Sequence, residues 1–341
     1  MAHPITPHSA EEAAAFRAAL DAANMSPLWE DEDRTGGGRR GPEAALLWRW
    51  EQVEPLITEA VRATSIENAD RRVLSLRKPA SNSVAAGLTT NLVAALQILM
   101  PGELAPAHRH TMGALRFVME GDGAETVVDG KSCPMAPGDM ILTPGWTWHE
   151  HVHKGSSRMV WFDGLDVPIH RHLETIRFEP GPAKDLPAQL PDAAFAAAGL
   201  VPQTSFDRRS FSPLHRYPWD AAKTALGETP RAEDGSRILR YTNPLTGGAA
   251  MDLIDCFLLG LDPGRPSAQT RSTSTAICVV AEGSGSSRIG ERDLAWGRNS
   301  IFTVPHGNWA SHCADASAIL FMMTDRDLMQ RLGVLRDEVR H

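Results

Sequence analysis

The sequence is poor in cysteine and has no long apolar run. It contains four cysteines in 341 residues, and none of them forms a Cys-x-x-Cys pair, which excludes the common cysteine-based metal and redox motifs. Isolated cysteines in a chain of this length indicate reduced thiols and a cytoplasmic location. No apolar stretch approaches the ~18 residues that suggest a membrane span, and the start of the chain lacks a signal-peptide pattern, so we expect no membrane partner.

Positive charge is also in short supply. The chain has 34 basic and 42 acidic residues, a formal net charge of -8, and no long basic run. We therefore expect no nucleic acid and no anionic membrane surface among its partners. The length exceeds what one hydrophobic core usually serves, which favours two domains.

An internal repeat supports this division. Two parts of the chain contain similar segments in the same order. The spacing between the first three pairs is identical, and the fourth pair is aligned on a shared proline. The matched pairs are 100–102 and 262–264, 108–110 and 270–272, 120–123 and 282–285, and 140–144 and 300–305. A repeat of this size indicates two similar domains.

Short β-type runs separated by Gly, Pro, Asp and Asn turns fill each copy. In the first copy they span 91–99, 114–119, 124–128, 139–143 and 158–162. Evenly spaced short strands are typical of a closed barrel or jelly roll, so we predict a mainly β protein with two β-barrel (jelly-roll) domains.

Helices are expected at both ends of the chain. Ser9 and Glu12 have capping-box spacing within residues 1–24, and Thr324 is the expected N-cap of an amphipathic helix that ends at Val339. The predicted organisation is an N-terminal helical arm (1–75), a metal-binding barrel (76–170), a linker with helix (171–235), a second barrel without metal ligands (236–323) and a C-terminal helix (324–341).

Histidines of the first copy form a candidate metal site. His108 and His110 occupy positions i and i+2 of a predicted strand and therefore share a face. The third ligand is open among three alternating histidines, and we favour His149 because it follows the 144–148 turn. His151 would then face the substrate or support the site, and His153 would lie on the surface. The alternative is a solvated histidine-rich loop.

The second copy lacks this set. It has Thr270, Ser272 and Ala310 at the three corresponding places, and none of these side chains replaces an imidazole as a ligand for a borderline transition metal. Only the first barrel should bind metal. His312 is expected to be a polar residue at a strand edge.

Strand parity adds further inward residues. Arg116 is an even number of positions beyond His110, so its guanidinium should face the same cavity and either form a structural salt bridge or bind a substrate carboxylate. Gln97 is the polar member of an otherwise apolar face, as a structural hydrogen-bonding group or a ligand contact. Asp163 is expected to orient a histidine. Arg71 and Arg72 are a solvated pair or one of them lies at the pocket rim.

Five segments of the chain form a recognisable set: Gln97-Ile98-Leu99-Met100-Pro101-Gly102-Glu103, His108-Arg109-His110-Thr111, Ala114-Leu115-Arg116-Phe117, Trp146-Thr147-Trp148-His149-Glu150-His151 and Asp163-Gly164-Leu165-Asp166-Val167-Pro168. With them the chain resembles the cupin superfamily, and more narrowly the gentisate 1,2-dioxygenase family with its salicylate, 5-nitrosalicylate and 1-hydroxy-2-naphthoate relatives. Many cupins have a Glu ligand shortly after the histidine pair, where this chain has Ala114 and Leu115.

The resemblance implies a cytoplasmic bicupin homotetramer that uses Fe(II) and O2 in aromatic catabolism. Its reaction is ring cleavage between the carbon bearing the carboxylate and the neighbouring carbon bearing hydroxyl. The implied metal ligands are His108, His110 and His149. The implied substrate-pocket and supporting residues are Arg116, His151, Gln97, Arg72 and Asp163. The positions implied to set substrate specificity are Val93, Ala95 and Met112.

The ligand set agrees with this chemistry, because three neutral histidines leave room and charge for a substrate that chelates through carboxylate and phenolate. Two alternatives stay open. One is a different metallo-cupin enzyme, such as a zinc or manganese isomerase or hydrolase, and the other is a non-catalytic cupin that binds small aromatic acids. The sequence does not choose among gentisate, salicylate, 5-substituted salicylates and 1-hydroxy-2-naphthoate.

Overall fold

The structure, a computed structural model, describes residues 9–25, 27, 43–66, 71–79, 87–197, 200–202 and 210–340. It divides into two compact units, Met1–Glu43 and Ala44–His341. In the first unit, helix α1 (Ala10–Ala22) begins after Ser9, whose hydroxyl accepts from the Glu12 N–H while the Glu12 carboxylate accepts from the Ser9 N–H. The predicted capping box is confirmed, and residues 1–8 of that prediction lie outside the described part.

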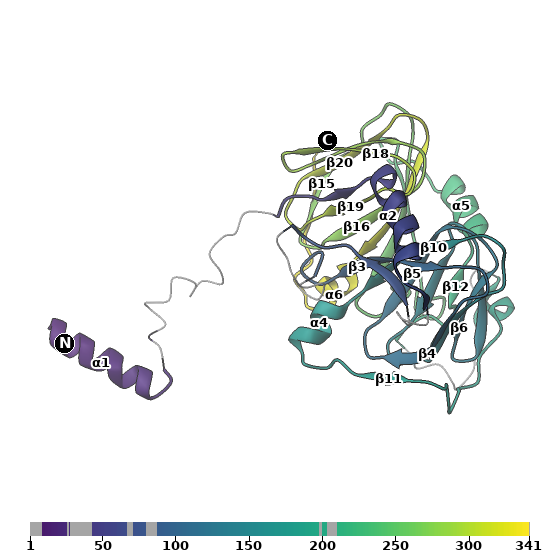
Figure 1. The fold of residues 1–341 in the computed structure, drawn as a ribbon. Helices are drawn as coiled ribbons and strands as arrows, with labels where there is room; N and C mark the ends of the chain where they lie inside the picture. The colour runs from purple at the N-terminus through teal and green to yellow at the C-terminus, as the bar shows by residue number, and fades with distance from the viewer. Residues whose placement is uncertain are drawn as a thin grey trace. The chain divides into compact units, whose positions relative to one another are not determined.

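The second unit contains two β-barrels, so the predicted two-barrel fold is confirmed (Figure 1). In the first barrel a six-stranded sheet, in the order β12-β8-β5-β10-β3-β2, faces a five-stranded sheet, in the order β11-β4-β9-β6-β7. Its strands are β2 (Arg72–Ser75), β3 (Val93–Leu99), β4 (Leu104–His110), β5 (Ala114–Glu120), β6 (Ala124–Val128), β7 (Lys131–Met135), β8 (Met140–Thr143), β9 (His149–His153), β10 (Met159–Leu165), β11 (Phe178–Pro180) and β12 (Arg216–Tyr217).

The second barrel repeats this plan with the orders β1-β19-β16-β21-β14-β13 and β18-β17-β20-β15-β22. Its strands are β1 (Leu47–Trp48), β13 (Arg237–Arg240), β14 (Asp255–Leu261), β15 (Gln269–Ser272), β16 (Ala276–Glu282), β17 (Gly285–Ile289), β18 (Arg292–Trp296), β19 (Ile301–Val304), β20 (Ala310–Ala314), β21 (Ala318–Thr324) and β22 (Asp337–Arg340). The helical segments of this unit are α2 (Trp50–Ala63), α4 (Val167–His172), η3 (Asp192–Phe195), α5 (Trp219–Glu228) and α6 (Arg326–Arg331).

Burial differs between strands of the five-stranded sheet and a central strand of the six-stranded sheet, and so does the polarity of their sequences. β6 and β9 alternate between buried and half-buried positions, since one face lines the barrel and the other approaches solvent. β3 is buried at every position, and its sequence is correspondingly apolar apart from Gln97. Both of its faces are covered, one by the barrel interior and the other by the second barrel.

The two six-stranded sheets pack against each other through one continuous hydrophobic core. Phe117 of β5 stacks on Phe321 of β21, with ring centroids 4.3 Å apart. A Cβ at Gly164 would stand 2.1 Å from the Met323 sulfur, so glycine at this position leaves room for the Met323 side chain between the two sheets. The barrels therefore stabilise each other and fix the back wall of each interior.

Several predicted boundaries differ from the structure. Within the predicted helical arm, β1 pairs with β19 of the second barrel and β2 pairs with β3 of the first. The predicted linker contributes β11 and β12 to the first barrel as well as helix α5. The single C-terminal helix is wrong, because α6 ends at Arg331 and β22 then pairs with β15. Its N-cap is Asp325 and not Thr324. A strand that forms only by pairing at the edge of a sheet has no local sequence signal, so these strands could not be assigned from the sequence.

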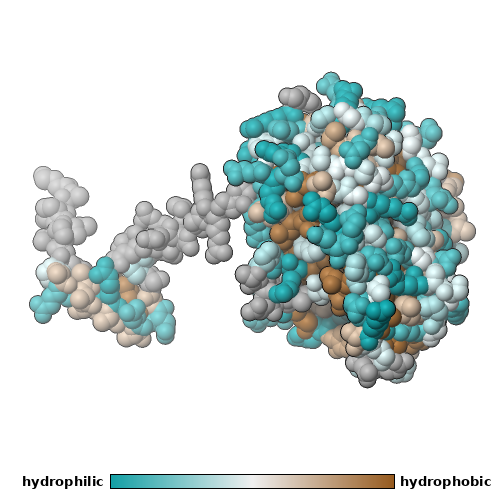
Figure 2. Space-filling model, turned by 45° about the horizontal axis from the view of Figure 1, so that its top comes forward, coloured by the Kyte–Doolittle hydropathy of each residue, from teal (hydrophilic) through white to brown (hydrophobic). Residues whose placement is uncertain are grey.

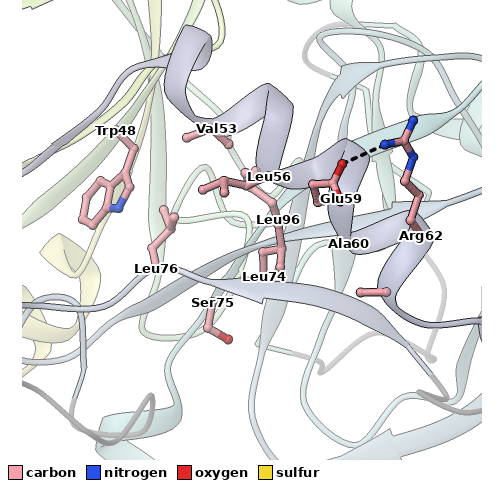
Figure 3. A pocket seen from close by; sticks show the side chains of 11 residues that line it. Trp48, Val53, Leu56, Glu59, Ala60, Arg62, Leu74, Ser75, Leu76 and Leu96 are labelled. Atoms are coloured by element: carbon pink, nitrogen blue, oxygen red, sulfur yellow. Dashed lines mark hydrogen bonds and ion pairs between the residues drawn. The ribbon is translucent and has the colours of Figure 1, made fainter.

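The outer surface is mostly hydrophilic with apolar patches between the charged side chains (Figure 2). A groove between α2 and the outer side of β2 and β3 is lined largely by apolar side chains and by the ion pair of Arg62 with Glu59 (Figure 3). It contains no histidine and is not part of the site below. Among the described residues, no helix is long and apolar enough to cross a membrane.

Candidate metal centre

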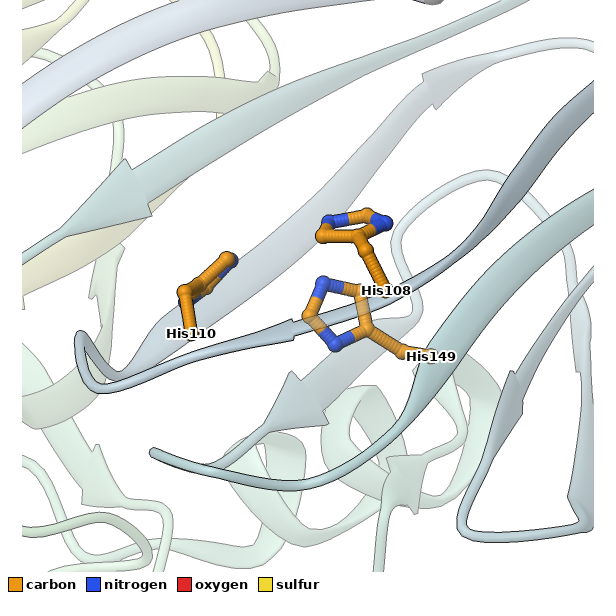
Figure 4. Close-up of side chains that lie close together, drawn as sticks. All are labelled: His108, His110 and His149. Carbon is orange, nitrogen blue, oxygen red and sulfur yellow. The ribbon is translucent and has the colours of Figure 1, made fainter. Parts of the chain in front are cut away.

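Three buried histidines converge inside the first barrel. His108 and His110 come from β4, and His149 begins β9, which pairs with β4 so that His108 lies opposite His149 (Figure 4). One ligand nitrogen from each ring lies within 4.8 Å of the others. The structure thus confirms that these histidines come together and selects His149 from the three alternatives on β9.

Backbone carbonyls orient all three rings. The Nδ1 atoms of His108, His110 and His149 lie 2.9, 2.8 and 3.0 Å from the carbonyl oxygens of Pro106, Met112 and Thr147. A carbonyl only accepts, so each Nδ1 carries the proton and each Nε2 presents a lone pair. The Nε2 of buried His149 has no hydrogen-bond partner among the described residues. This donor set fits a divalent transition-metal cation.

Burial keeps these imidazoles neutral. Desolvation, followed by the nearby Arg71 guanidinium, lowers the pKa of His108 to about 3. Desolvation also lowers the pKa of His110 to about 4, and it lowers the pKa of His149 well below its usual value with a further contribution from Arg116. Neutral imidazole is the form that binds a metal, so the site is prepared for a cation near neutral pH.

Arg116 faces this interior from β5, as expected, although the parity prediction assumed one unbroken strand and β4 ends at His110. Its Nη1 donates to the Thr143 hydroxyl at 2.7 Å, and its Nε lies 3.4 Å from the Asp163 carboxylate. Desolvation raises the pKa of Asp163 to about 6, against the opposing effect of Arg116. The arginine is therefore held in place by neighbours on both sides.

Asp163 does not orient a histidine, contrary to expectation. It accepts a hydrogen bond from the Trp161 indole N–H at 3.1 Å and pairs with Arg116, while carbonyls orient the metal-site rings. Trp161 is fully buried and its ring centroid lies 5.2 Å from that of His151. The sequence reasoning missed Trp161, although it shares the inward parity of Asp163.

The two adjacent arginines have different partners. Arg72 is buried, donates twice to the Glu103 carboxylate and twice to the Thr64 carbonyl, and so fastens the start of β2. Arg71 Nη1 lies 2.9 Å from His108 Nε2, and its guanidinium lies 5.6 Å from the centre of the Phe178 ring. Phe178 also stacks on His108, at 5.4 Å. The geometry thus favours Arg71 in place of Arg72 at the site.

The proposed specificity positions line up with these groups. Across the six-stranded sheet, Ala95 lies opposite Asp163 and Val93 lies opposite Leu165. Gln97 lies opposite Trp161, and its buried amide nitrogen has no hydrogen-bond partner among the described residues. The Met112 carbonyl accepts from His110, and the Met112 sulfur lies 3.5 Å from the Thr111 hydroxyl.

Three further histidines considered in the sequence analysis, His151, His153 and His312, are buried as well. His151 lies opposite Thr126, and its Nδ1 is 2.9 Å from the threonine hydroxyl. Its Nε2 has no hydrogen-bond partner among the described residues. The prediction that His153 lies on the surface is wrong, because its side chain is buried and its Nε2 lies 2.6 Å from the Ser157 carbonyl oxygen. The edge position expected for His312 is also wrong, since it is buried beside Ser287.

Comparison with known proteins agrees with this architecture. The family described as "Cupin domain" matches residues 95–168. Gentisate 1,2 dioxygenase 1 of Aquipseudomonas alcaligenes is 34% identical over 340 residues, covering 97% of this chain and 97% of the relative. The chain belongs to the gentisate 1,2-dioxygenase family. It is accordingly a bicupin oxidoreductase of the dioxygenase type.

Other members of the family are similar over nearly the same length. The 5-aminosalicylate 1,2-dioxygenase of a Comamonas species is 33% identical, covering 93% of this chain and 87% of that protein. The crystal structure of salicylate 1,2-dioxygenase from Pseudoaminobacter salicylatoxidans with gentisate has a TM-score of 0.88 at 27% identity, covering 98% of this chain and 96% of the other. Both barrels of this family member therefore have a counterpart of known structure.

Proposed function

We propose that this protein is an Fe(II)-dependent dioxygenase that uses O2 to open the ring of a salicylate-class acid between the carbon bearing the carboxylate and the carbon bearing hydroxyl. The observation that carries the proposal is the neutral three-histidine cluster with the Arg116 and Arg71 guanidinium groups beside it. Relatives named for gentisate, 5-aminosalicylate and salicylate support the substrate class.

His108, His110 and His149 would hold the iron through their Nε2 atoms. Three neutral ligands leave coordination positions and the full cationic charge for a substrate that binds through adjacent carboxylate and phenolate oxygens. Bound Fe(II) supplies the reducing power for O2 chemistry and a template for the chelating acid. The protein supplies the rigid ring orientations, because each ligand is fixed by a carbonyl on its own strand or turn.

Arg116 would bind the substrate carboxylate. Its guanidinium is buried, and Thr143 and Asp163 occupy its Nη1 and Nε sides. A planar guanidinium held in this way is suited to pairing with a carboxylate in a water-poor interior. Arg71, whose Nη1 lies 2.9 Å from His108 Nε2, adds a second positive charge that favours an anionic acid, and it would release this nitrogen when the metal binds.

His151 would accept the phenolic proton of the substrate. It is buried two residues from a ligand, and its Nε2 has no hydrogen-bond partner among the described residues. General bases of this kind typically contribute about 10²- to 10⁴-fold to rate. Gln97 is a polar neighbour with an amide N–H group available to a substrate oxygen.

Oxygen uptake by the Fe(II)-loaded protein tests the proposal. Gentisate, salicylate, 5-nitrosalicylate, 5-chlorosalicylate and 1-hydroxy-2-naphthoate should be supplied in parallel, with anaerobic and Zn(II)-loaded protein as controls. We expect one mole of O2 consumed per mole of acid, ring-opened product, and no turnover with Zn(II). Zinc- or manganese-dependent chemistry without O2 consumption would support the other metallo-cupin enzymes, and tight binding without turnover would support a non-catalytic binding protein.

The homotetramer and the preferred acid stay predictions. Sedimentation of the metal-loaded protein measures the first, and the ratio of kcat/KM values in the same substrate panel measures the second. We expect Val93 and Ala95 to set that ratio, because they lie on the strand that faces Asp163 and Leu165.

A further inference from the structure

Each barrel contains a buried histidine paired with a hydroxyl at the same place. In the first barrel Thr126 of β6 lies opposite His151 of β9, and in the second Ser287 of β17 lies opposite His312 of β20. The hydroxyl oxygen is 2.9 Å from Nδ1 in the first pair and 2.7 Å in the second. The pair has thus been kept in a barrel that has lost its three metal-site histidines.

The third member of each group differs. The last residue of β7, Met135, places its sulfur 3.2 Å from the Thr126 hydroxyl. The last residue of β18, Trp296, places its indole nitrogen 2.8 Å from the Ser287 hydroxyl. A thioether sulfur only accepts a hydrogen bond, whereas an indole N–H only donates one.

We propose that this third residue sets the tautomer of the histidine, so that Met135 makes His151 a proton acceptor at Nε2 while Trp296 gives His312 the opposite form. A hydroxyl has one hydrogen to donate. In the first barrel Thr126 donates it to the Met135 sulfur and accepts from His151 Nδ1–H, which is the arrangement that makes both contacts hydrogen bonds. The alternative places lone pairs of oxygen and sulfur against each other.

In the second barrel the direction reverses. Trp296 donates to the Ser287 oxygen, and the serine hydrogen is then donated to His312 Nδ1. If His312 carried its proton on Nδ1, the buried hydroxyl hydrogen of Ser287 would lose this acceptor, and an unpaired buried polar group is unfavourable. His312 therefore carries its proton on Nε2.

The consequence for the first barrel rests on the proposed function. His151 with its proton on Nδ1 presents a bare Nε2 to the interior, which is the form that takes the phenolic proton of the substrate. Thr126 and Met135 are positioning residues, because they act on the reaction through His151. The structure thereby assigns a role to two side chains that reach the site through His151.

Nitrogen-15 magic-angle-spinning NMR of the metal-free, full-length protein labelled at histidine tests the assignment. His151→Gln and His312→Gln variants identify the two sets of signals. We expect His151 to be protonated at Nδ1 and His312 at Nε2 at neutral pH. Finding both histidines in the same tautomer would overturn the proposal, and this reading does not depend on which reaction the protein catalyses.

Met135→Leu is the decisive variant. It nearly conserves volume and removes only the sulfur acceptor, so the Thr126 hydrogen turns to His151 Nδ1 and the two nitrogen signals of His151 exchange character. With the ring-cleaving acid as substrate, kcat should fall by about 10²-fold with KM unchanged, in line with loss of a general base. An unchanged His151 tautomer would refute the role of Met135.

Two further variants separate positioning from folding. Thr126→Ser keeps the hydroxyl, so the protein should retain the His151 tautomer and most of kcat. Thr126→Val removes the hydroxyl, so it should retain neither. Ser287→Ala is the matched change in the second barrel, and it should alter the His312 signals while leaving kcat unchanged. If the wild-type protein consumed no oxygen with any acid while the two tautomers were as expected, the proposed function would fail and the tautomer assignment would stand.

Discussion

The two barrels have the same strand order but differ in the polarity of the side chains that face their interiors. Register matches four inward residues of the first barrel, Arg116, Gln97, Asp163 and Thr143, with Cys278, Leu259, Met322 and Val304 of the second. The three metal-site histidines are matched in the same way by Thr270, Ser272 and Ala310. The second barrel thus has uncharged side chains at each place where the first has Arg116, Asp163 or a metal-site histidine.

This difference separates what the fold requires from what the site requires. Replacing a buried ion pair by well-packed apolar residues is often neutral or stabilising, by about 1–4 kcal/mol. The second barrel shows that the fold is compatible with such a core. The fold therefore does not require the polar interior of the first barrel.

The largest expected effect comes from removing a ligand. His108→Ala should reduce bound iron and turnover to background, because two histidines do not complete the set. The matched change Thr270→Ala in the second barrel should alter neither. Metal content after anaerobic loading and oxygen uptake measure both, and an active His108→Ala protein without iron would refute the assignment of the metal centre.

Exchanging the ion pair for the residues of the second barrel tests the comparison directly. Arg116→Cys leaves the Asp163 carboxylate buried without its cation and should lower the free energy of unfolding by about 3–5 kcal/mol. Adding Asp163→Met should recover most of that loss. About 1 kcal/mol should stay lost, because the Trp161 N–H no longer has the Asp163 carboxylate as its acceptor.

Denaturant unfolding measures the stability of both variants, and calorimetry measures binding of the acid. Neither variant should bind the substrate carboxylate. If Arg116→Cys were as stable as the wild type, the buried pair would have no structural weight. If it bound the acid normally, the carboxylate would be held elsewhere.

The buried histidine of the second barrel should make stability depend on pH. Burial lowers the pKa of His312 to about 4 from its usual 6.5. The unfolded chain takes up a proton below pH 6.5 while the folded protein does not, so stability is full above this pH and is lost as pH falls toward 4. His312→Asn should remove up to about 3 kcal/mol of that loss. Denaturant unfolding of the metal-free wild type and variant at pH 7 and pH 4.5 measures this difference. If both proteins lost the same free energy of unfolding between these pH values, the expectation would be contradicted.

The smallest expected effect is a change in substrate preference. Val93→Trp should narrow the range of ring substituents and change kcat/KM ratios across the substrate panel by about 10-fold, a difference of ~1.4 kcal/mol in transition-state binding. Iron content should stay the same, since Val93 lies on β3 and the metal-site histidines lie on β4 and β9. An unaltered substrate profile would remove Val93 from the specificity argument.

Much of this molecule could be predicted from its sequence because its signals are local or repeated. Strand periodicity located β3, β5, β6, β8 and β10 to within a few residues, and the repeat identified the barrel that lost its metal-site histidines. His108 and His110 could be placed together because the i, i+2 rule operates within one strand.

What could not be predicted depends on contacts between distant segments. Arg71 and Arg72 are adjacent, and their opposite partners follow from where β2 begins and from Glu103 on another segment. The burial of His312 depends on Ser287, which belongs to a different strand. The failed prediction of a C-terminal helix has the same origin, since β22 forms only because β15 offers it an edge.

The pairing of β1 with β19 also bears on how the chain folds during synthesis. Leu46 donates to the Thr303 hydroxyl across 257 positions of sequence, and Leu47 pairs with Phe302 beside it. At a synthesis rate of about 5–20 residues per second, β1 leaves the ribosome well before its partner exists. The second barrel therefore reaches its final form only after nearly the whole chain has emerged, and a chain truncated before β19 leaves β1 with its edge unpaired and open to aggregation.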